Sequence, residues 1–592
     1  MRIKHFFGLA VIAAMTASCS SNNDLVNGGG NGSGENESGA SYASITIDLP
    51  TTSGTRAAND KFDGGTASEY AVNDATLVIF KKGTATSEND YQYVETASLG
   101  NLEPWKKDNT TDNGITTEAT ITAELKQAAV GENGDYYALV ILNNEKGTDK
   151  KVTLPTGTTT YGAWNIANKA TAENLVDNTK GFYMANAPEF TKNGTEPTTL
   201  VPIKGIYRTK EEAHSKPGTT VHVERGLAKV TVGSNSTSDY FAAAGANATG
   251  NKYKSDNVKI SSWALDVINK TSFPVHVTTG LKLGATWTDQ TIPSYATIWN
   301  NVAKTTDRFV SQLTAEGAFK RVYWGIDPNY SMDLSDLTKC KAQFTLAEAN
   351  GNGVTWNTGS GSDKPLYCLE NTFDINNMLQ GQTTRVLLKA TYTPSAVAKE
   401  EDKTFFMIGN SSDIWTKNNL ITQITNKAKE ALNKPTAELT VVLQGDLLTA
   451  GTHVFTESNV SIKEGETEIK VDADLVAKLN TKLGLDKSKG LGIKTYKNGE
   501  SYYIARIKHF GDDLTPWKEG NKTYDENNDS WLGRYGVLRN NWYDLTIEKI
   551  SGPGYPDVPE VKPETLDDED TKYINVSVKI LDWAKRSQSV DL

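Results

Sequence analysis

The sequence predicts a mainly β protein made of two β-sandwich domains. Apolar residues occur in short runs in which every second residue is apolar, the pattern of a strand with one buried face. Gly, Asn and Asp, which are favoured in tight turns, separate these runs. At 592 residues the chain is long enough for several bodies, and its linkers indicate two. Short strands joined by such turns are typical of β-sandwiches with Greek-key connections.

The first series of predicted strands lies before residue 225. One helical interruption is expected at 158–180, where the strand pattern is lost. The run from Val221 to Val232 continues into the second series without a flexible linker, so the domain boundary is placed near Arg225. The predicted strands are Thr76–Phe80, Ile115–Leu125, Tyr136–Leu142, Phe182–Ala185, Leu200–Ile206 and Thr219–Val223.

The second series extends to residue 550. Two helices are expected at 413–432 and 472–483, because apolar residues there recur at spacings of three and four. Each helix would cover a face or an edge of a sheet. The predicted strands are Val258–Ile268, Phe273–Val277, Ala342–Leu346, Arg385–Thr393, Phe405–Ile408, Leu439–Leu443, Tyr502–His509 and Tyr543–Ile550.

The first 18 residues have the features of an export signal. Arg2 and Lys4 precede the apolar run Phe6–Ala17, which is too short for a stable membrane span. Small residues then precede Cys19, which resembles the bacterial lipobox, where the Cys becomes the lipid-modified first residue. The alternative is an ordinary cleavage site with an incidental cysteine. A lipid on Cys19 would tether the exported chain to a membrane.

A complete strand follows the flexible, polar segment 20–40. Its apolar positions alternate with Ser44, Thr46 and Asp48, and the small-residue loop after it contains a single arginine, Arg56. Loops of this composition are where proteases cut. The alternative is a permanent first strand. The apolar positions are Ala43, Ile45, Ile47 and Leu49.

A similar strand lies near the C-terminus, after a segment rich in proline and acidic residues at 551–573. Such a segment is stiff and charged, and it predicts that the strand is separated from the body and has no local partner. A β-branched strand without a partner is an aggregation hazard, so we expect it to add to the open sheet edge of another molecule. Its inward positions are Ile574, Val576, Val578 and Ile580.

Charge and cysteine content exclude several classes of function. The net charge of −11 argues against nucleic acid and anionic membrane surfaces as partners. Three cysteines are too few for a disulfide scaffold or a Cys-based zinc site. Cys340 and Cys368 are either one disulfide or two buried free thiols.

We find no pattern of an active site. The six histidines are dispersed without a two-His metal spacing, and the common nucleophile and phosphate-binding motifs are missing from the sequence. Asp512 and Asp513 could be read as a carboxylate pair for glycoside hydrolysis, but adjacent residues rarely have the separation this chemistry needs. We expect no enzymatic activity, no cofactor and no metal.

Eight segments of the sequence carry a resemblance to a known family, and they are Tyr136–Asn143, Val221–Lys229, Tyr367–Thr372, Tyr502–His509, Tyr535–Ile547, Ile550–Gly554, Val576–Trp583 and Val590–Leu592. They resemble the type V fimbrial shaft subunits of the minor-fimbrium (Mfa-like) family of Gram-negative oral and gut bacteria. The resemblance is specific near the C-terminus and looser between residues 230 and 340.

The resemblance implies two transthyretin-like β-sandwich domains and a maturation pathway. The precursor would be an outer-membrane lipoprotein, acylated with palmitate at Cys19 and attached only through that lipid. An arginine-specific protease would cut between Arg56 and Ala57 and discard the first strand. The open groove would then take the C-terminal strand of the next identical subunit, in which Leu581 and Trp583 continue the donor segment. The composition of the acidic proline linker departs from the family pattern.

The expected product is a shaft of subunits joined head to tail, with anchor and tip subunits at its ends, that supports cell adhesion and biofilm formation. The alternative is a surface glycan-binding lipoprotein of a polysaccharide-uptake system, which needs no unpaired terminal strand. The expected divisions of the chain are a signal at 1–18, a propeptide at 19–56, sandwich domains at 57–224 and 225–550, a linker at 551–573 and a donor strand at 574–592.

Overall fold

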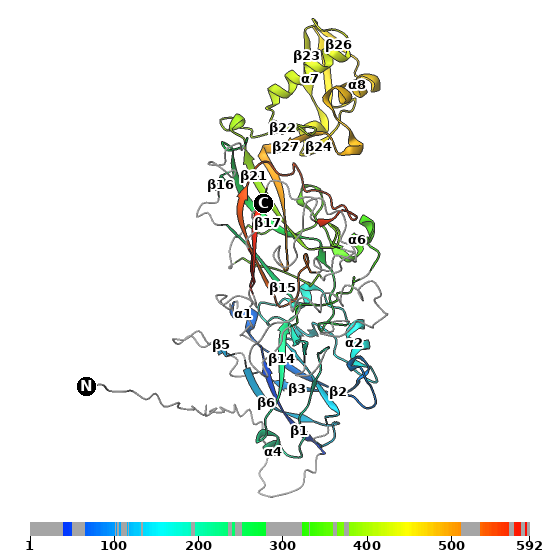
Figure 1. The fold of residues 1–592 in the computed structure, drawn as a ribbon, viewed down its shortest axis with the longest axis vertical. Helices are drawn as coiled ribbons and strands as arrows, with labels where there is room; N and C mark the ends of the chain where they lie inside the picture. The colour runs from blue at the N-terminus through cyan, green and yellow to red at the C-terminus, as the bar shows by residue number, and fades with distance from the viewer. Residues whose placement is uncertain are drawn as a thin grey trace, which may run out of the picture.

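Most of the ordered structure is β, as predicted, and the molecule is extended along one axis (Figure 1). None of the described helices combines the length and the apolar composition that crossing a membrane requires. The computed structural model describes residues 39–49, 66–100, 102, 106–107, 115–116, 118–131, 134–190, 196–234, 240–242, 252–279, 322–330, 332–358, 364–371, 378–510, 533–567, 574–581 and 586–588.

Eight strands from the N-terminal part form one sheet, in the order β3-β2-β7-β10-β14-β1-β6, with β13 also paired to β7. Separate apolar clusters include the side chains of alternate residues of β2 and β7, so the sheet is buried on both faces. The strands are β1 (Ser41–Asp48), β2 (Ala75–Lys81), β3 (Gln92–Gly100), β6 (Glu118–Leu125), β7 (Tyr136–Leu142), β10 (Met184–Asn186), β13 (Val201–Pro202) and β14 (Thr219–Arg225).

Short helices and hairpins connect these strands. The predicted helical interruption at 158–180 is two short helices, each with a threonine N-cap that accepts a backbone hydrogen bond. The elements are α1 (Ala67–Tyr70), η1 (Glu88–Asp90), α2 (Tyr161–Ala167), α3 (Ala172–Leu175), α4 (Lys210–His214), β4 (Lys106–Lys107), β5 (Ile115–Thr116), β8 (Glu145–Lys146), β9 (Asp149–Lys150), β11 (Glu189–Phe190) and β12 (Pro197–Thr198).

Two further sheets share one core in the middle of the molecule. Their orders are β20-β15-β29-β30-β31 and β16-β17-β21-β28, and side chains of both sheets belong to one apolar cluster. The strands are β15 (Ala228–Ser234), β16 (Tyr240–Ala242), β17 (Asn257–Asp266), β20 (Leu366–Cys368), β21 (Arg385–Thr393), β28 (Glu500–Arg506), β29 (Trp542–Ile550), β30 (Ile574–Leu581) and β31 (Arg586–Gln588).

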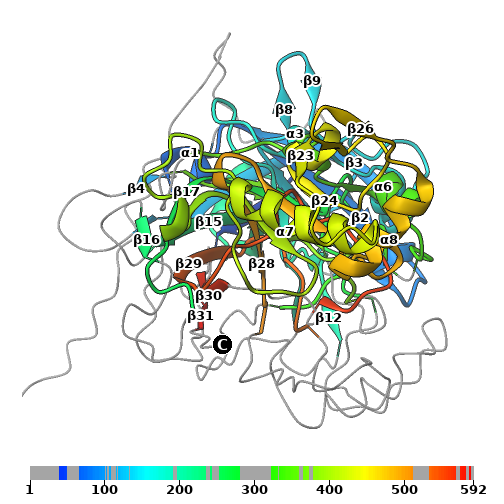
Figure 2. The same cartoon turned by 90° about the horizontal axis from the view of Figure 1, so that it is seen from above.

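A small lobe lies at one end of the long axis, and Figure 2 views the molecule from that end (Figures 1 and 2). This lobe has its own apolar core, and the sequence did not predict it as a separate body. The two predicted helices are present there and pack on two three-stranded sheets. The elements are β22 (Phe405–Ile408), α7 (Lys417–Ala431), β23 (Leu439–Leu443), η5 (Gly445–Leu448), β24 (Gly451–His453), β25 (Val460–Glu464), β26 (Thr467–Ile469), α8 (Ala473–Leu483), η6 (Lys487–Lys489), β27 (Ile493–Tyr496) and η7 (Lys497–Gly499).

The predicted strand Phe273–Val277 is wrong. The segment is buried, but the side chain of Asn165 contacts both backbone groups of Val275, at 2.9 and 3.0 Å. Its apolar residues therefore reflect packing between segments rather than pairing in a sheet. At 342–346 only β19 is a strand, because α6 occupies the first part. The remaining elements are β18 (Ile268–Asn269), α6 (Leu337–Gln343), β19 (Phe344–Thr345), η2 (Ala349–Gly351) and η4 (Ser395–Val397).

Candidate functional site

The candidate site is the position of β1 in the interior of the N-terminal sheet. β1 runs parallel to β14, where Ile45–Asp48 lie opposite Thr219–His222. It runs antiparallel to β6 along its whole length. Because β1 is bonded on both sides, removing it would leave two unpaired strand edges facing one another.

The inward side chains of β1 fill the core beneath the sheet. They pack in one cluster with Leu77 and Ile79 of β2 and Val140 of β7. Complete burial of an Ile or Leu side chain contributes about 1.5 to 3 kcal/mol. The groove under β1 is therefore deep and apolar, and the residues that fill it, each at most 2% exposed, are Ala43, Ile45, Ile47 and Leu49.

The outer face of β1 is also covered, which the alternating pattern did not predict. Ser44 and Thr46 are 5% and 8% exposed, and α4 lies against the strand. Thr46 Oγ1 is 2.9 Å from Thr120 Oγ1 on β6. A Cβ added at Gly218 would lie 2.5 Å from Thr46 Oγ1 and 3.2 Å from Ser44 Oγ. Any side chain at residue 218 would therefore collide with β1, so the outer face of the strand is closely packed against this glycine.

The two ends of β1 are more open. At the start, Tyr42 and Tyr207 exchange a pair of backbone hydrogen bonds of 2.8 Å each. At the end, Asp48 is opposite Glu118 of β6, and its Oδ2 lies 3.8 Å from Nε2 of His222 on β14. Burial raises the pKa of the Asp48 carboxyl, Glu118 raises it further, and His222 opposes the rise.

The C-terminal strand has a partner in the same chain, so the prediction that it has none is wrong. β30 pairs antiparallel with β29, from Ile574 opposite Ile550 to Leu581 opposite Trp542, with one irregularity near Lys549. Lys579 is opposite Asp544 in this register, and β31 pairs with the other side of β30. The edge of β29 accepts the strand because the chain before β30 returns along the body.

The described part of the linker, 551–567, packs on the middle of the molecule instead of projecting from it. Tyr555 exchanges backbone hydrogen bonds with Tyr502, at 2.7 and 2.9 Å. Val558 and Val561 are buried, and Asp567 forms a buried ion pair with Arg506 at 3.1 Å. The prolines allow this path because an extended segment can lie on a sheet as well as away from it.

Cys340 and Cys368 are free, buried thiols in different apolar clusters, which excludes a disulfide between them. Burial raises the pKa of the Cys340 thiol to about 11 and that of Cys368 to about 12. Neutral thiols at such positions are unreactive. The predicted sites at Cys19, Arg56, Ala57 and Trp583 lie outside the described residues, as do Asp512 and Asp513.

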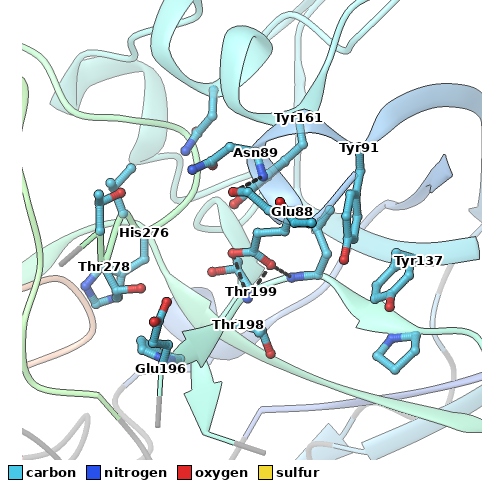
Figure 3. Close-up of a pocket in the computed structure, with 18 residues that line it drawn as sticks. Glu88, Asn89, Tyr91, Tyr137, Tyr161, Glu196, Thr198, Thr199, His276 and Thr278 are labelled. Atoms are coloured by element: carbon cyan, nitrogen blue, oxygen red, sulfur yellow. Dashed lines mark hydrogen bonds between the residues drawn. The ribbon is translucent and has the colours of Figure 1, made fainter. Parts of the chain in front are cut away.

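A cavity of about 450 Å³ lies beside η1 and β12 (Figure 3). The Glu88 carboxylate accepts hydrogen bonds from the backbone N–H groups of Thr199 and Leu200, at 2.9 and 3.0 Å. His276 is 2.7 Å from both Glu224 and the Trp324 carbonyl. These polar groups stabilise the walls, and no cluster of metal-ligating side chains occurs in the described part of the chain.

Buried charges connect the N-terminal sheet to the middle of the molecule. Glu69 of α1 forms an ion pair with Lys229 of β15 at 2.8 Å, and both side chains are at most 1% exposed. Arg225 Nε donates to the Glu69 carbonyl at 2.6 Å, and the Lys229 ammonium lies 3.9 Å from the centre of the Trp542 ring. Sequence reasoning missed this cluster, although a lone lysine in the apolar run after Gly226 was a signal for it.

Residues 494–589 match the family model described as the C-terminal domain of fimbrillin, major fimbrial subunit protein type IV. No curated protein matches the chain. The solved structures that resemble it include a candidate cell adhesion protein from Parabacteroides distasonis ATCC 8503, with 10% identity, coverage of 92% of this chain and 98% of that chain, and a TM-score of 0.35.

Two other solved structures resemble the chain weakly. One is a fimbrial assembly protein from Parabacteroides distasonis ATCC 8503, with 11% identity, coverage of 63% and 93% of the two chains, and a TM-score of 0.25. The other is the tip fimbrial protein Mfa3 from Porphyromonas gingivalis with a C-terminal truncation, with 10% identity, coverage of 92% and 100%, and a TM-score of 0.27. Likenesses at these TM-scores establish neither the domain arrangement nor the function.

The family match covers β28, β29, β30 and β31. The matched range contains four of the segments on which the predicted resemblance rests, Tyr502–His509, Tyr535–Ile547, Ile550–Gly554 and Val576–Trp583. This match agrees with the predicted resemblance to fimbrial subunits, and residues 494–589 of the chain resemble a fimbrillin C-terminal domain.

Proposed function

We propose that this subunit forms the shaft of a fimbrium by donor-strand exchange. The precursor is attached to the outer membrane through a lipid on Cys19, and an arginine-specific protease cuts between Arg56 and Ala57. β1 then leaves, and the C-terminal strand of another copy takes its place in the body formed by residues 57–224. Repetition builds a filament that supports adhesion and biofilm formation and ends in anchor and tip subunits.

The observation that carries this proposal is the position of β1. It is an interior strand with three core side chains, and Leu49 directly after it adds a fourth. In the sequence it nevertheless precedes all other described strands and is joined to them only through the segment that contains Arg56. A single cut in that segment makes the strand a separate peptide. An ordinary first strand that forms an edge would leave no groove with two walls.

Assembly also requires the C-terminal strand to leave its own subunit. β30 lies beside β29 at the side of the sheet that ends in the short strand β31, so its departure leaves β29 still paired to β15. Donation to a neighbour is a heterologous contact that does not close, and it therefore produces a filament.

The test is substitution of the predicted cleavage residue in cells that make the fimbrium. Arg56→Ala and Arg56→Lys should both leave β1 attached, because an arginine-specific protease cuts after neither residue. Monomers of precursor size should accumulate, and the SDS-resistant ladder of polymers should be lost. Lys61→Ala, in the same segment, is the matched control and should assemble normally.

N-terminal sequencing of the surface form gives the second measurement. We expect the parent protein to begin at Ala57. Polymers of normal length from Arg56→Lys that begin upstream of Ala57 would rule out release of β1.

A further inference from the structure

We infer that the incoming strand lies in the groove in the same direction as β1, with Ile574 at the position of Ala43 and Lys579 at the position of Asp48. The inference rests on the proposed function and adds the register of the exchange and the residue that discriminates between the two strands. The partner is a second copy of this chain, and its contacting segment is Ile574–Leu581.

The outer positions of β1 restrict what can replace it. Because Ser44 and Thr46 are 5% and 8% exposed, the replacing strand needs short, uncharged side chains at these two positions. In the inferred register Asn575 and Ser577 occupy them. Apolar residues occupy every core position from 43 to 49, and they are Ile574, Val576, Val578 and Ile580.

Moving the incoming strand along the groove by two residues from this register, in either direction, places a charged side chain at a core position. A shift that places Val576 at the Ala43 position puts Asp582 in the core position of Leu49. The opposite shift puts Lys572 at the Ala43 position, where the side chain is fully buried. Either change would bury a charge in an apolar groove, which is strongly unfavourable.

Continued past Ile574, the inferred register would place Lys572 at Ser41, which is 4% exposed and donates to the Ala128 carbonyl at 2.7 Å. The exchanged segment therefore begins at Ile574, and Lys572 stays outside the groove.

The reverse direction fails at the outer face. An antiparallel replacement of β1 that keeps the core positions apolar puts Lys579 at the position of Ser44. Ser44 is 5% exposed, so a lysine at this position would bury its ammonium. A strand that enters in the direction of the original β1 instead places Lys579 at Asp48, which is the more open outer position at the end of β1.

The charges at that position favour the incoming strand over β1. Asp48 is opposite Glu118 on β6, and the other ionisable groups nearby are His222 and Glu189, which lie 3.0 Å apart. Like charges directly opposite in an antiparallel pair are destabilising, whereas opposite charges are stabilising. Exchange therefore replaces a carboxylate with an ammonium beside Glu118, and Lys579 becomes the residue that discriminates between the strands.

Cysteine pairs test the register directly in polymers formed after arginine-specific cleavage. Lys579→Cys combined with Glu118→Cys should give an inter-subunit disulfide, because opposite positions have Cβ atoms close enough to bridge. The ladder should then survive boiling in SDS and collapse on reduction. Asn575→Cys with Glu118→Cys is the control, because it bridges only if the strand enters in the reverse direction.

A second experiment tests the charge. Lys579→Glu should slow elongation several-fold, and adding Glu118→Lys should restore it, because the swapped pair is again complementary. Bridging by the Asn575 pair in place of the Lys579 pair would overturn the register and leave strand exchange intact. Failure of the swap to restore elongation would overturn the role of Lys579. Absence of any ladder from the cleaved parent protein would instead overturn the proposed function.

Discussion

At the end of β1, the Asp48 carboxyl occupies a half-buried place opposite Glu118. Burial is the main reason that its pKa is raised, and Glu118 adds to it. A raised pKa means that the neutral carboxyl favours the folded state. Its contribution is complete below the ordinary Asp pKa of about 3.9 and is lost as the pH rises through the raised value. At neutral pH the ionised Asp48 therefore weakens the attachment of β1.

Asp48→Asn should consequently stabilise the uncleaved protein near neutral pH, because an amide carries no charge to bury. The difference from the parent should decrease as the pH falls toward the ordinary Asp pKa, where both side chains are neutral. Thermal unfolding of the two proteins across this pH range measures the effect. An identical difference at every pH would show that the charge of Asp48 is not the cause.

The same site shows what a sequence can reveal at the scale of single elements. Alternation located the inward residues of β1, because a period of two is a local property of a strand. It could not identify β6, β14 or Gly218 as neighbours, since these contacts join segments that are distant in the chain. The covered outer face of β1 therefore came only from the structure.

Other elements also show that local patterns predict single strands and helices, whereas contacts between distant segments do not follow from them. The strands 136–142, 385–393, 405–408 and 439–443 have the predicted bounds, and α7 and α8 lie within their predicted ranges. The lobe that contains these helices was not predicted as a separate body, because one of its two sheets depends on the pairing of β22 with β27, which are distant in the chain. Pairing of β30 with β29 was missed because four prolines were interpreted as a spacer.

This pairing makes a prediction for the uncleaved monomer. Deleting 574–592 should lower its melting temperature, because β29 loses a full set of backbone partners. A loss of about 2 kcal/mol corresponds to about 3 °C for a body as large as residues 225–550, at about 2 cal/mol/K of unfolding entropy per residue. Deleting only Ser589–Leu592, beyond β31, is the matched control and should have little effect. An unchanged melting temperature for the longer deletion would mean that β30 is not retained by its own subunit.

For the whole molecule, the feature that matters most is the junction between the N-terminal sheet and the middle. Only Gly226 and Leu227 separate β14 from β15. Across this junction Glu69 and Lys229 form a buried ion pair, and Asn165 bonds to Val275. The junction between the N-terminal sheet and the middle of the molecule is thus only two residues long in the chain, and the buried ion pair and the hydrogen bond stabilise it.

Glu69→Gln should destabilise this junction, because Lys229 would remain buried while facing a neutral amide. Removing one partner of a buried ion pair costs about 3 to 5 kcal/mol. In denaturant unfolding, the Glu69→Gln variant should have its midpoint at a lower denaturant concentration than the parent protein. The control is Glu430→Gln on α7, whose exposed ion pairs with Lys427 and Lys482 contribute little. Equal midpoints for the two variants would show that the pair does not stabilise the junction.

A junction of this kind also determines where a filament could bend. If each subunit is a stiff rod from the groove of β1 to the small lobe, thermal bending is confined to the joints between subunits. The persistence length of the filament is then governed by the few residues that connect β30 to the body of its own subunit. Shortening that connection would stiffen the whole fibre without altering any subunit.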